Sequence, residues 1–240
     1  EQHLITILQD PAATQPANDF ACRMLRRMGS KNAIPALTEA LQTVSLFDMA
    51  RWAMEKMPYE EVDKIFRREL KRAEGEYRLG LISSIANRED QKAVRIIEDY
   101  LDSDDRELKA ASIKALGRIG GQDAFEALHE LNVEKSLQQD VDDSLLLCAD
   151  QFLQNRQWNK AASVYRVLVK QDKPVLTRVA AIHGLAQLKS PADAAGEITK
   201  YLKSDEAAVR ESALSEFVMG LPGTEASEKL IDAIDDVDND

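Results

Sequence analysis

The sequence has little of what several large classes of protein require. Aromatic side chains make up 5% of its 240 residues, and it holds ten Gly, seven Pro and two Cys. No apolar run approaches the roughly 18 residues that a membrane-spanning helix needs, so we expect no transmembrane segment. The 31 Lys and Arg stand against 42 Asp and Glu, a net charge of −11. A surface with this net charge disfavours binding to anionic membranes and sequence-independent binding to nucleic acid.

The residues that are abundant favour helices. Ala, Leu, Glu, Lys and Arg dominate, and clusters of β-branched residues are too few to build a sheet, so the composition predicts an all-α fold. The chain begins with Glu1 rather than Met. We therefore expect a processing boundary there, and the 240 residues could form a piece of a longer polypeptide.

A small residue followed four positions later by a larger, usually apolar residue recurs seven times. The intervals are 29, 30, 32, 37, 32 and 32 residues, and a period of this length is typical of helical repeats. The third pair is the weakest, because Ser84 is polar, although Leu81 and Ile85 supply an apolar side next to it. The pairs are Ala21/Leu25, Ala50/Met54, Gly80/Ser84, Ser112/Leu116, Ala149/Leu153, Ala181/Leu185 and Ala213/Phe217.

Each pair lies in an amphipathic segment that is followed, after a turn, by a second segment with apolar residues at helical spacing. Val62, Ile65 and Phe66 are an example of the second kind. Each repeat is therefore predicted to be a helical hairpin. The whole chain, 1–240, is predicted to be a single α-α superhelix, or solenoid, of about seven hairpins with an acidic tail over 232–240.

These residues resemble a known family. The stretch from Val209 to Phe217, with 108–120 and 177–185 in step, resembles HEAT repeats, specifically the short, phycobilisome-lyase type. The unit at about 141–170 departs from this pattern and resembles a tetratricopeptide repeat, with Arg156 where that family usually has Gly. The residues that carry this second resemblance are Ala149, Phe152, Trp158, Ala161, Tyr165 and Leu168. Resemblance alone favours a bacterial periplasmic or cell-surface protein.

The sequence offers no constellation for catalysis, so we predict no catalytic residue, no metal site and no cofactor. His3, His129 and His183 fall in three separated repeats, and no metal-binding, phosphate-binding or nucleophile motif is present. Cys22 and Cys148 are four repeats apart, so we expect two unpaired cysteines that pack as small apolar residues. The Asp and Ser residues before several helices are interpreted as helix caps.

A first candidate surface for a partner lies two residues after each small residue of the repeat. This column is mainly polar and reads Arg23, Trp52, Ile82, Lys114, Gln151, His183 and Ser215. Trp52 and Ile82 break the pattern in consecutive repeats, so they could form an apolar docking patch. The alternative is that Trp52 folds over a neighbouring helix, or that the register is wrong by one residue.

A second candidate surface is basic. Residues 1–72 hold 11 Lys and Arg against 10 Asp and Glu, whereas residues 73–240 hold 20 against 32. Four cations at helical offsets of 0, 1, 4 and 5 could bind an acidic ligand, and they are Arg67, Arg68, Lys71 and Arg72. The alternative is a solvated helix face screened by Asp63 and Glu69.

The sequence thus predicts a scaffold that binds a protein or peptide without catalysis. The acidic C-terminal repeats would prefer a basic partner. The alternative function is an enzyme, because short HEAT-like arrays also resemble bilin lyases and alkylpurine DNA glycosylases. Sequence alone indicates neither the partner nor the oligomeric state.

Overall fold

The computed structural model describes residues 1–220, 227, 228 and 231. These residues form α-helices, short 3-10 helices and turns, and no strand occurs among them, which confirms the all-α fold. Within the same residues, no helix is both long and apolar enough to cross a membrane. The predicted acidic tail, 232–240, lies outside the described residues.

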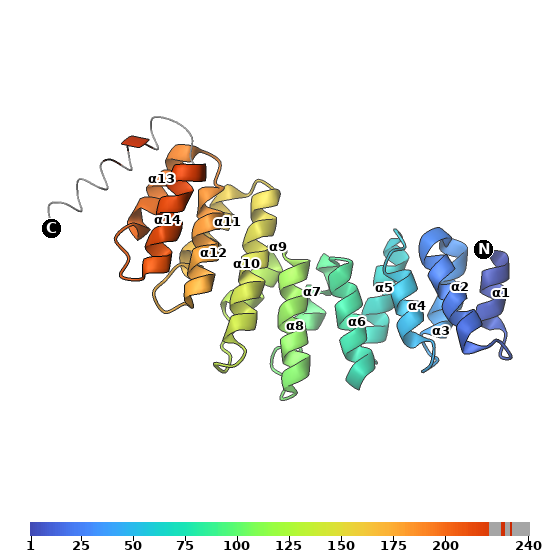
Figure 1. Ribbon diagram of the computed structural model, residues 1–240. Helices are drawn as coiled ribbons and strands as arrows, with labels where there is room; N and C mark the ends of the chain where they lie inside the picture. Colours follow the sequence, from blue (N-terminus) through green and yellow to red (C-terminus); the bar gives the residue numbers. More distant parts are fainter. Residues whose placement is uncertain (221–226, 229–230, 232–240) are drawn as a thin grey trace. The chain divides into compact units, whose positions relative to one another are not determined.

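The chain divides into two compact units, which we call unit 1 (Glu1–Ile119) and unit 2 (Gly120–Asp240). The predicted single array over 1–240 stays a prediction. Within each unit the helices alternate between a first and a second helix of successive hairpins, as Figure 1 shows by their order along the chain. Each unit is thus built as a solenoid is, from stacked helical hairpins.

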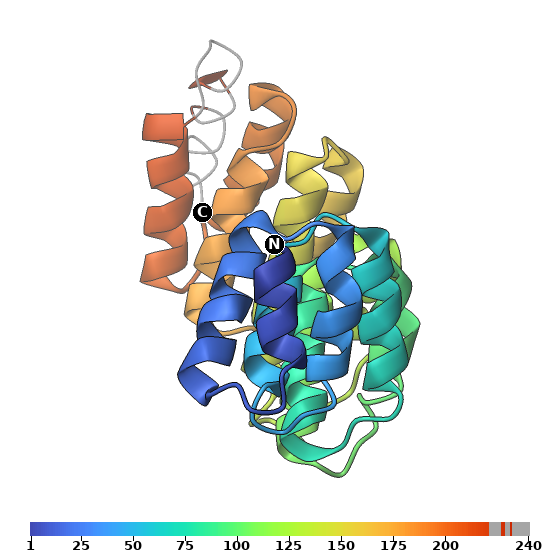
Figure 2. The ribbon, with the colours of Figure 1, turned by 90° about the vertical axis from the view of Figure 1, so that its right-hand side faces the viewer.

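Unit 1 contains eight α-helices among its described residues. The first helices of its hairpins pack side by side, α2 on α4, α4 on α6 and α6 on α8. Figure 2 views this unit from its N-terminal end, where α1 is nearest and packs against α2 and α3. The helices are α1 (Gln2–Gln9), α2 (Gln15–Met28), α3 (Ile34–Ala40), α4 (Phe47–Met54), α5 (Glu60–Leu70), α6 (Gly75–Asn87), α7 (Val94–Glu98) and α8 (Arg106–Ile119).

Unit 2 contains six α-helices between residues 121 and 220. Helix α10 packs against α9, α11 and α12, and α12 packs against α13 and α14. Ser190 caps α13, accepting a hydrogen bond from the amide of Asp193 at 3.1 Å, as the Ser-Pro sequence predicts. The helices are α9 (Gly121–His129), α10 (Gln138–Gln154), α11 (Trp158–Leu168), α12 (Val175–Ala186), α13 (Pro191–Ile198) and α14 (Ala207–Gly220).

The small residues of the repeat lie in the cores of the two units, where they let helices approach closely. Six of the seven are fully buried: Ala21, Ala50, Ser112, Ala149, Ala181 and Ala213. The seventh, Gly80, is half-buried, and the pair Leu81 and Ile85 takes the buried place in α6. The register of the third repeat is therefore wrong by one residue.

Ser84 is nevertheless buried, because α4 and the residue directly after it provide polar partners for it. Its hydroxyl donates to Glu55 Oε1 at 2.7 Å and accepts from Arg51 Nη1 at 3.2 Å. A buried hydroxyl that both donates and accepts carries little desolvation penalty. The α4–α6 contact is thus partly polar. For this reason the third repeat lacks the apolar residue that the pattern expects at position 84.

Candidate binding surfaces

Trp52 lies on α4 and is 38% exposed, in agreement with its predicted place on a solvent-facing column. One face of its indole is covered by Arg26 of α2, whose guanidinium carbon lies 4.0 Å from the ring centroid. This is a cation–π contact, which holds both side chains against the first layer of helices. A partner would therefore meet a Trp52 ring of which one face is already covered by Arg26.

Ile82 does not join Trp52 on the surface, and this part of the prediction is wrong. Ile82 is 1% exposed. When the third repeat is aligned on Leu81 instead of Gly80, Ile82 directly follows the first residue of the repeat's pair. Cys22, Ile113 and Ile182 have the same place in their repeats and are also buried. Ser83 takes the solvent-facing place instead. The two-residue apolar patch therefore does not form.

The four basic residues of α5 and its C-terminal turn do not act as one free cationic face. Arg67, whose side chain is 14% exposed, pairs with Asp90 before α7. Arg68 pairs with its neighbour Glu69 at 2.7 Å. Lys71 and Arg72 are exposed. Half of the predicted cluster is thus neutralised within unit 1, and a role in binding stays a prediction for Lys71 and Arg72.

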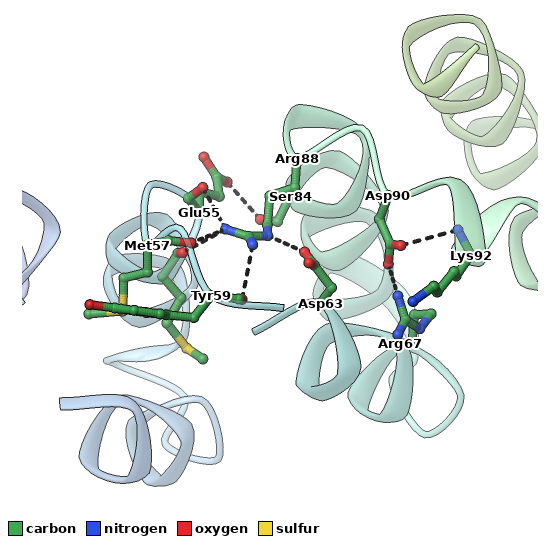
Figure 3. Close-up of polar contacts among 10 residues, drawn as sticks. Glu55, Met57, Tyr59, Asp63, Arg67, Ser84, Arg88, Asp90 and Lys92 are labelled. Atoms are coloured by element: carbon green, nitrogen blue, oxygen red, sulfur yellow. Dashed lines mark hydrogen bonds and ion pairs between the residues drawn. The ribbon is translucent and has the colours of Figure 1, made fainter. Parts of the chain in front are cut away.

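Arg88 organises the turn between α4 and α5, as Figure 3 shows. Its Nη1 donates to the carbonyl oxygens of Met54, Glu55 and Met57 at 3.3, 3.0 and 2.7 Å, and its Nη2 donates to that of Tyr59 at 3.2 Å. Its Nε pairs with Asp63 of α5. One guanidinium thus provides donors to carbonyls at the end of α4 and in the turn after it, where intrahelical partners run out.

Arg26 approaches the same end of α4 from the opposite neighbour. Its Nη1 donates to the carbonyl oxygen of Trp52 and lies 3.9 Å from Glu55 Oε2. Cations near a helix C-terminus also interact favourably with the helix dipole. The last turn of α4 is therefore capped by arginines of α2 and α6. These two arginines therefore have a structural role.

A surface hollow of about 770 Å³ lies where the α3–α4 and α5–α6 turns meet. We call it the aromatic hollow, because Phe47 and Tyr77 form its wall with ring centroids 4.6 Å apart and planes at 86°. Val44, in the α3–α4 turn, is 79% exposed at this site. The lining residues are Leu41, Gln42, Val44, Phe47, Glu69, Arg72, Ala73, Glu74, Gly75, Glu76, Tyr77 and Leu81.

The charged residues of the aromatic hollow are mostly acidic. The lining holds one cation, Arg72, and three acids, Glu69, Glu74 and Glu76, a net charge of −2. Glu69 is paired with Arg68, which lies outside the lining. Glu69 accepts from Gln42 Nε2 at 3.0 Å. Of the predicted residues, only Arg72 belongs to this hollow. The signal that could have indicated it is Val44, an apolar residue in a turn between two helices.

Both cysteines are buried, one in each unit, and they form no disulfide, as expected. Burial, with a smaller contribution from Asp19, raises the pKa of the Cys22 thiol to about 11. Burial raises the pKa of Cys148 to about 12. The reactive thiolate is therefore scarce in the folded protein.

We expect both thiols to react with iodoacetamide at pH 8 at least ~100-fold more slowly than a free cysteine, because so little thiolate is present. Mass spectrometry of the two cysteine-containing peptides would measure each rate separately. Addition of urea should raise both rates as the units open. Fast alkylation of either thiol without urea would contradict its burial.

The described residues contain no group of three or more His, Cys, Asp or Glu placed to hold a metal ion. The histidines lie apart. His3 is exposed in α1, His129 stacks on Phe125 with centroids 5.3 Å apart, and His183 Nδ1 lies 2.9 Å from Glu216 Oε1. His129 and His183 thus make contacts within unit 2.

The fold and these surfaces define a helical-hairpin repeat protein. Residues 64–141, from α5 to the start of α10, match the family model described as HEAT repeats, which confirms HEAT-like repeats in this chain. The more specific phycobilisome-lyase type and the tetratricopeptide-like unit stay predictions. No curated protein matches the chain.

Several solved structures are similar to this chain. A crystal structure of an engineered protein is 18% identical, with a TM-score of 0.47, covering 96% of this chain and 71% of that one. Human deoxyhypusine hydroxylase in complex with glycerol is 15% identical, with a TM-score of 0.41 and coverage of 91% and 96%. A second engineered protein is 16% identical, with a TM-score of 0.33 and coverage of 96% and 97%. These values are too low to support an inference of function.

Proposed function

We propose that this chain is a non-catalytic scaffold that binds an extended segment of a partner protein in the aromatic hollow of unit 1. The observation that carries the proposal is the exposed apolar surface at this hollow. Val44 is 79% and Tyr77 36% exposed, next to the buried Phe47. Isolated exposed apolar residues are ordinary, but a hollow with an aromatic wall is typical of a docking site.

The size and charge of the hollow indicate the partner. Its volume of about 770 Å³ accommodates one or two large side chains. An apolar side chain placed against Phe47 and Tyr77 would remove apolar surface from water. A neighbouring Lys or Arg would then meet the acidic rim formed by Glu74 and Glu76, both of which are exposed. The favoured partner segment is therefore apolar and basic.

A random peptide library displayed on phage would test this function with the full chain as bait. We expect enrichment of peptides in which an aromatic or large aliphatic residue is next to Lys or Arg. Tyr77→Ala should weaken the selected peptides by about 30-fold, because truncating an aromatic anchor typically costs ~2 kcal/mol. Fluorescence anisotropy would measure the affinity.

Phe20→Ala is the matched control, because Phe20 is 54% exposed in the same unit and does not line the hollow. It should leave the affinity unchanged, and circular dichroism should show that both variants fold. Peptides that bind equally well to Tyr77→Ala would place the site elsewhere. A library without any enriched sequence would count against a peptide-binding scaffold.

A further inference from the structure

Unit 2 is acidic overall, but its positive charge is concentrated in one stretch. Residues 120–240 hold 12 Lys and Arg against 22 Asp and Glu, a difference of −10. Within them, residues 151–192 hold seven basic residues and a single acid, Asp172, a difference of +6. This stretch spans α11, α12 and the turns at their ends.

Some of these cations have structural roles. Lys173 pairs with the fully buried Asp142 at 2.7 Å. Arg178 is buried, and its guanidinium donates to the carbonyl of Val169 at 3.2 Å and to the hydroxyl of Ser204 at 3.3 Å. Lys173 ties the α11–α12 turn to α10, and Arg178 ties α12 to the end of α11 and to Ser204, so neither is available to a ligand.

Four other cations line a hollow of about 820 Å³ between α11 and α13, which we call the cationic hollow. They are Arg156, Lys160, Arg166 and Lys189. The acids in the same lining are Asp193 and Glu197, so the lining has a net charge of +2. Unit 2 has ten more acidic than basic residues, yet this hollow on its surface is positively charged.

The pairing within this hollow leaves most of the positive charge unmatched. Arg166 binds Glu197 through two hydrogen bonds of 2.8 and 3.2 Å, and Lys200 adds a third at 3.0 Å. Arg156, Lys160 and Lys189 are exposed and form no ion pair with any residue that the structure describes. Asp193 is the one lining acid left to face these three cations.

The cations come from three separate segments. Arg156 belongs to the α10–α11 turn, Lys160 to the first turn of α11, and Lys189 to the turn before α13. Small residues, Ala162, Ala192 and Gly196, leave room between them, and Trp158 adds a half-buried ring. A ligand with several separate carboxylates fits this distribution better than one with a single anionic centre.

We propose that the cationic hollow binds an acidic polypeptide segment, with side-chain carboxylates of consecutive Asp or Glu residues paired with Arg156, Lys160 and Lys189. This site is additional to the aromatic hollow and has the opposite charge preference. A long nucleic acid fits less well, because its phosphates would continue beyond the hollow onto an acidic surface. The proposal does not depend on the function proposed for unit 1.

Fluorescein-labelled hexaglutamate, titrated against the full chain, tests the proposal by anisotropy. We expect binding in 50 mM salt that weakens at least ~10-fold in 500 mM salt, because ions screen exposed charges. Lys160→Gln combined with Lys189→Gln should weaken binding at least ~10-fold. The matched control is Lys170→Gln combined with Lys135→Gln, two exposed lysines of unit 2 outside the hollow, which should keep at least half of the affinity.

Trp158 provides a second readout, because Trp52 is the only other tryptophan. In a Trp52→Phe variant, hexaglutamate should change the emission of Trp158. Tyr77→Ala should leave this binding unchanged, so failure here and failure of the aromatic hollow are distinguishable.

Three results would overturn the proposal. The first is no binding of hexaglutamate in 50 mM salt, or equal loss in the test and control variants. The second is tighter binding of hexathymidylate or inorganic phosphate than of hexaglutamate, which would assign the hollow to a different anion. The third is binding of hexaglutamate that leaves the emission of Trp158 unchanged in the Trp52→Phe variant, which would place the peptide outside the cationic hollow.

Discussion

Arg88→Ala should lower the free energy of unfolding of unit 1 by about 3 kcal/mol, because removing one partner of a buried charged network typically costs ~3–5 kcal/mol. The Arg88 guanidinium donates hydrogen bonds to the carbonyls of Met54, Glu55, Met57 and Tyr59, and it forms an ion pair with Asp63. Alanine would remove this donor from the carbonyls of Glu55 and Met57 and from the Asp63 carboxylate, whereas the carbonyls of Met54 and Tyr59 keep a backbone donor. The α4–α5 turn should open first.

Hydrogen exchange would locate this effect. Amides of residues 54–63 should lose protection in Arg88→Ala, and alkylation of Cys22 should accelerate. Arg95→Ala is the control, because Arg95 is an exposed arginine of the same unit, on α7. Equal protection of residues 54–63 in Arg88→Ala and in the wild type would show that the turn is held by other contacts.

Gly184→Ala should destabilise unit 2 by about 2 kcal/mol, the balance of two opposed effects. A β-carbon at Gly184 would overlap the ring of Tyr165, which is fully buried and donates to Asp150 Oδ1 at 2.5 Å. Forcing that ring aside costs up to ~3 kcal/mol as overpacking, whereas alanine gains about 1 kcal/mol of helix propensity over glycine. Thermal unfolding and alkylation of Cys148 would measure the difference.

Gly80→Ala is the matched control for this prediction. Gly80 is also inside a helix, but a β-carbon there would mainly meet the side chain of Arg51, with Phe47 at 3.1 Å. Moving Arg51 would loosen its hydrogen bonds to Asp48 and Ser84, a cost that offsets the ~1 kcal/mol of helix propensity that alanine gains over glycine. Gly80→Ala should therefore be nearly neutral. If Gly184→Ala raises the stability of unit 2, Tyr165 must have room to move, and the close approach of α11 and α12 would be looser than described.

The sequence predicted the helices well, because each hairpin depends on local spacing of apolar and small residues. Ala21, Ala50 and Ala181 are fully buried as the repeat requires. The third repeat was displaced by one residue because the partners of Ser84 lie on α4 and directly after it, 29 and 33 residues earlier. Local spacing does not contain such information.

The candidate sites were less predictable for the same reason. Arg67 looks free in the sequence, yet its counter-charge Asp90 is 23 residues away, in the next repeat. Ile82 looked exposed because the register was taken from Gly80. The cationic stretch at 151–192 was visible in the sequence, but summing the charge over 73–240 concealed it. Charge balance in a repeat protein is better evaluated one hairpin at a time.

The two arginines at the end of α4 have a consequence for how this protein could be re-engineered or could evolve. Repeats are often regarded as interchangeable blocks that are added or deleted singly. Here α4, the first helix of the second hairpin, has its C-terminal end capped by Arg26 of the hairpin before it and by Arg88 of the hairpin after it. Deleting or transplanting that hairpin alone would separate it from both. The smallest piece of unit 1 that can be moved intact is therefore a run of three hairpins.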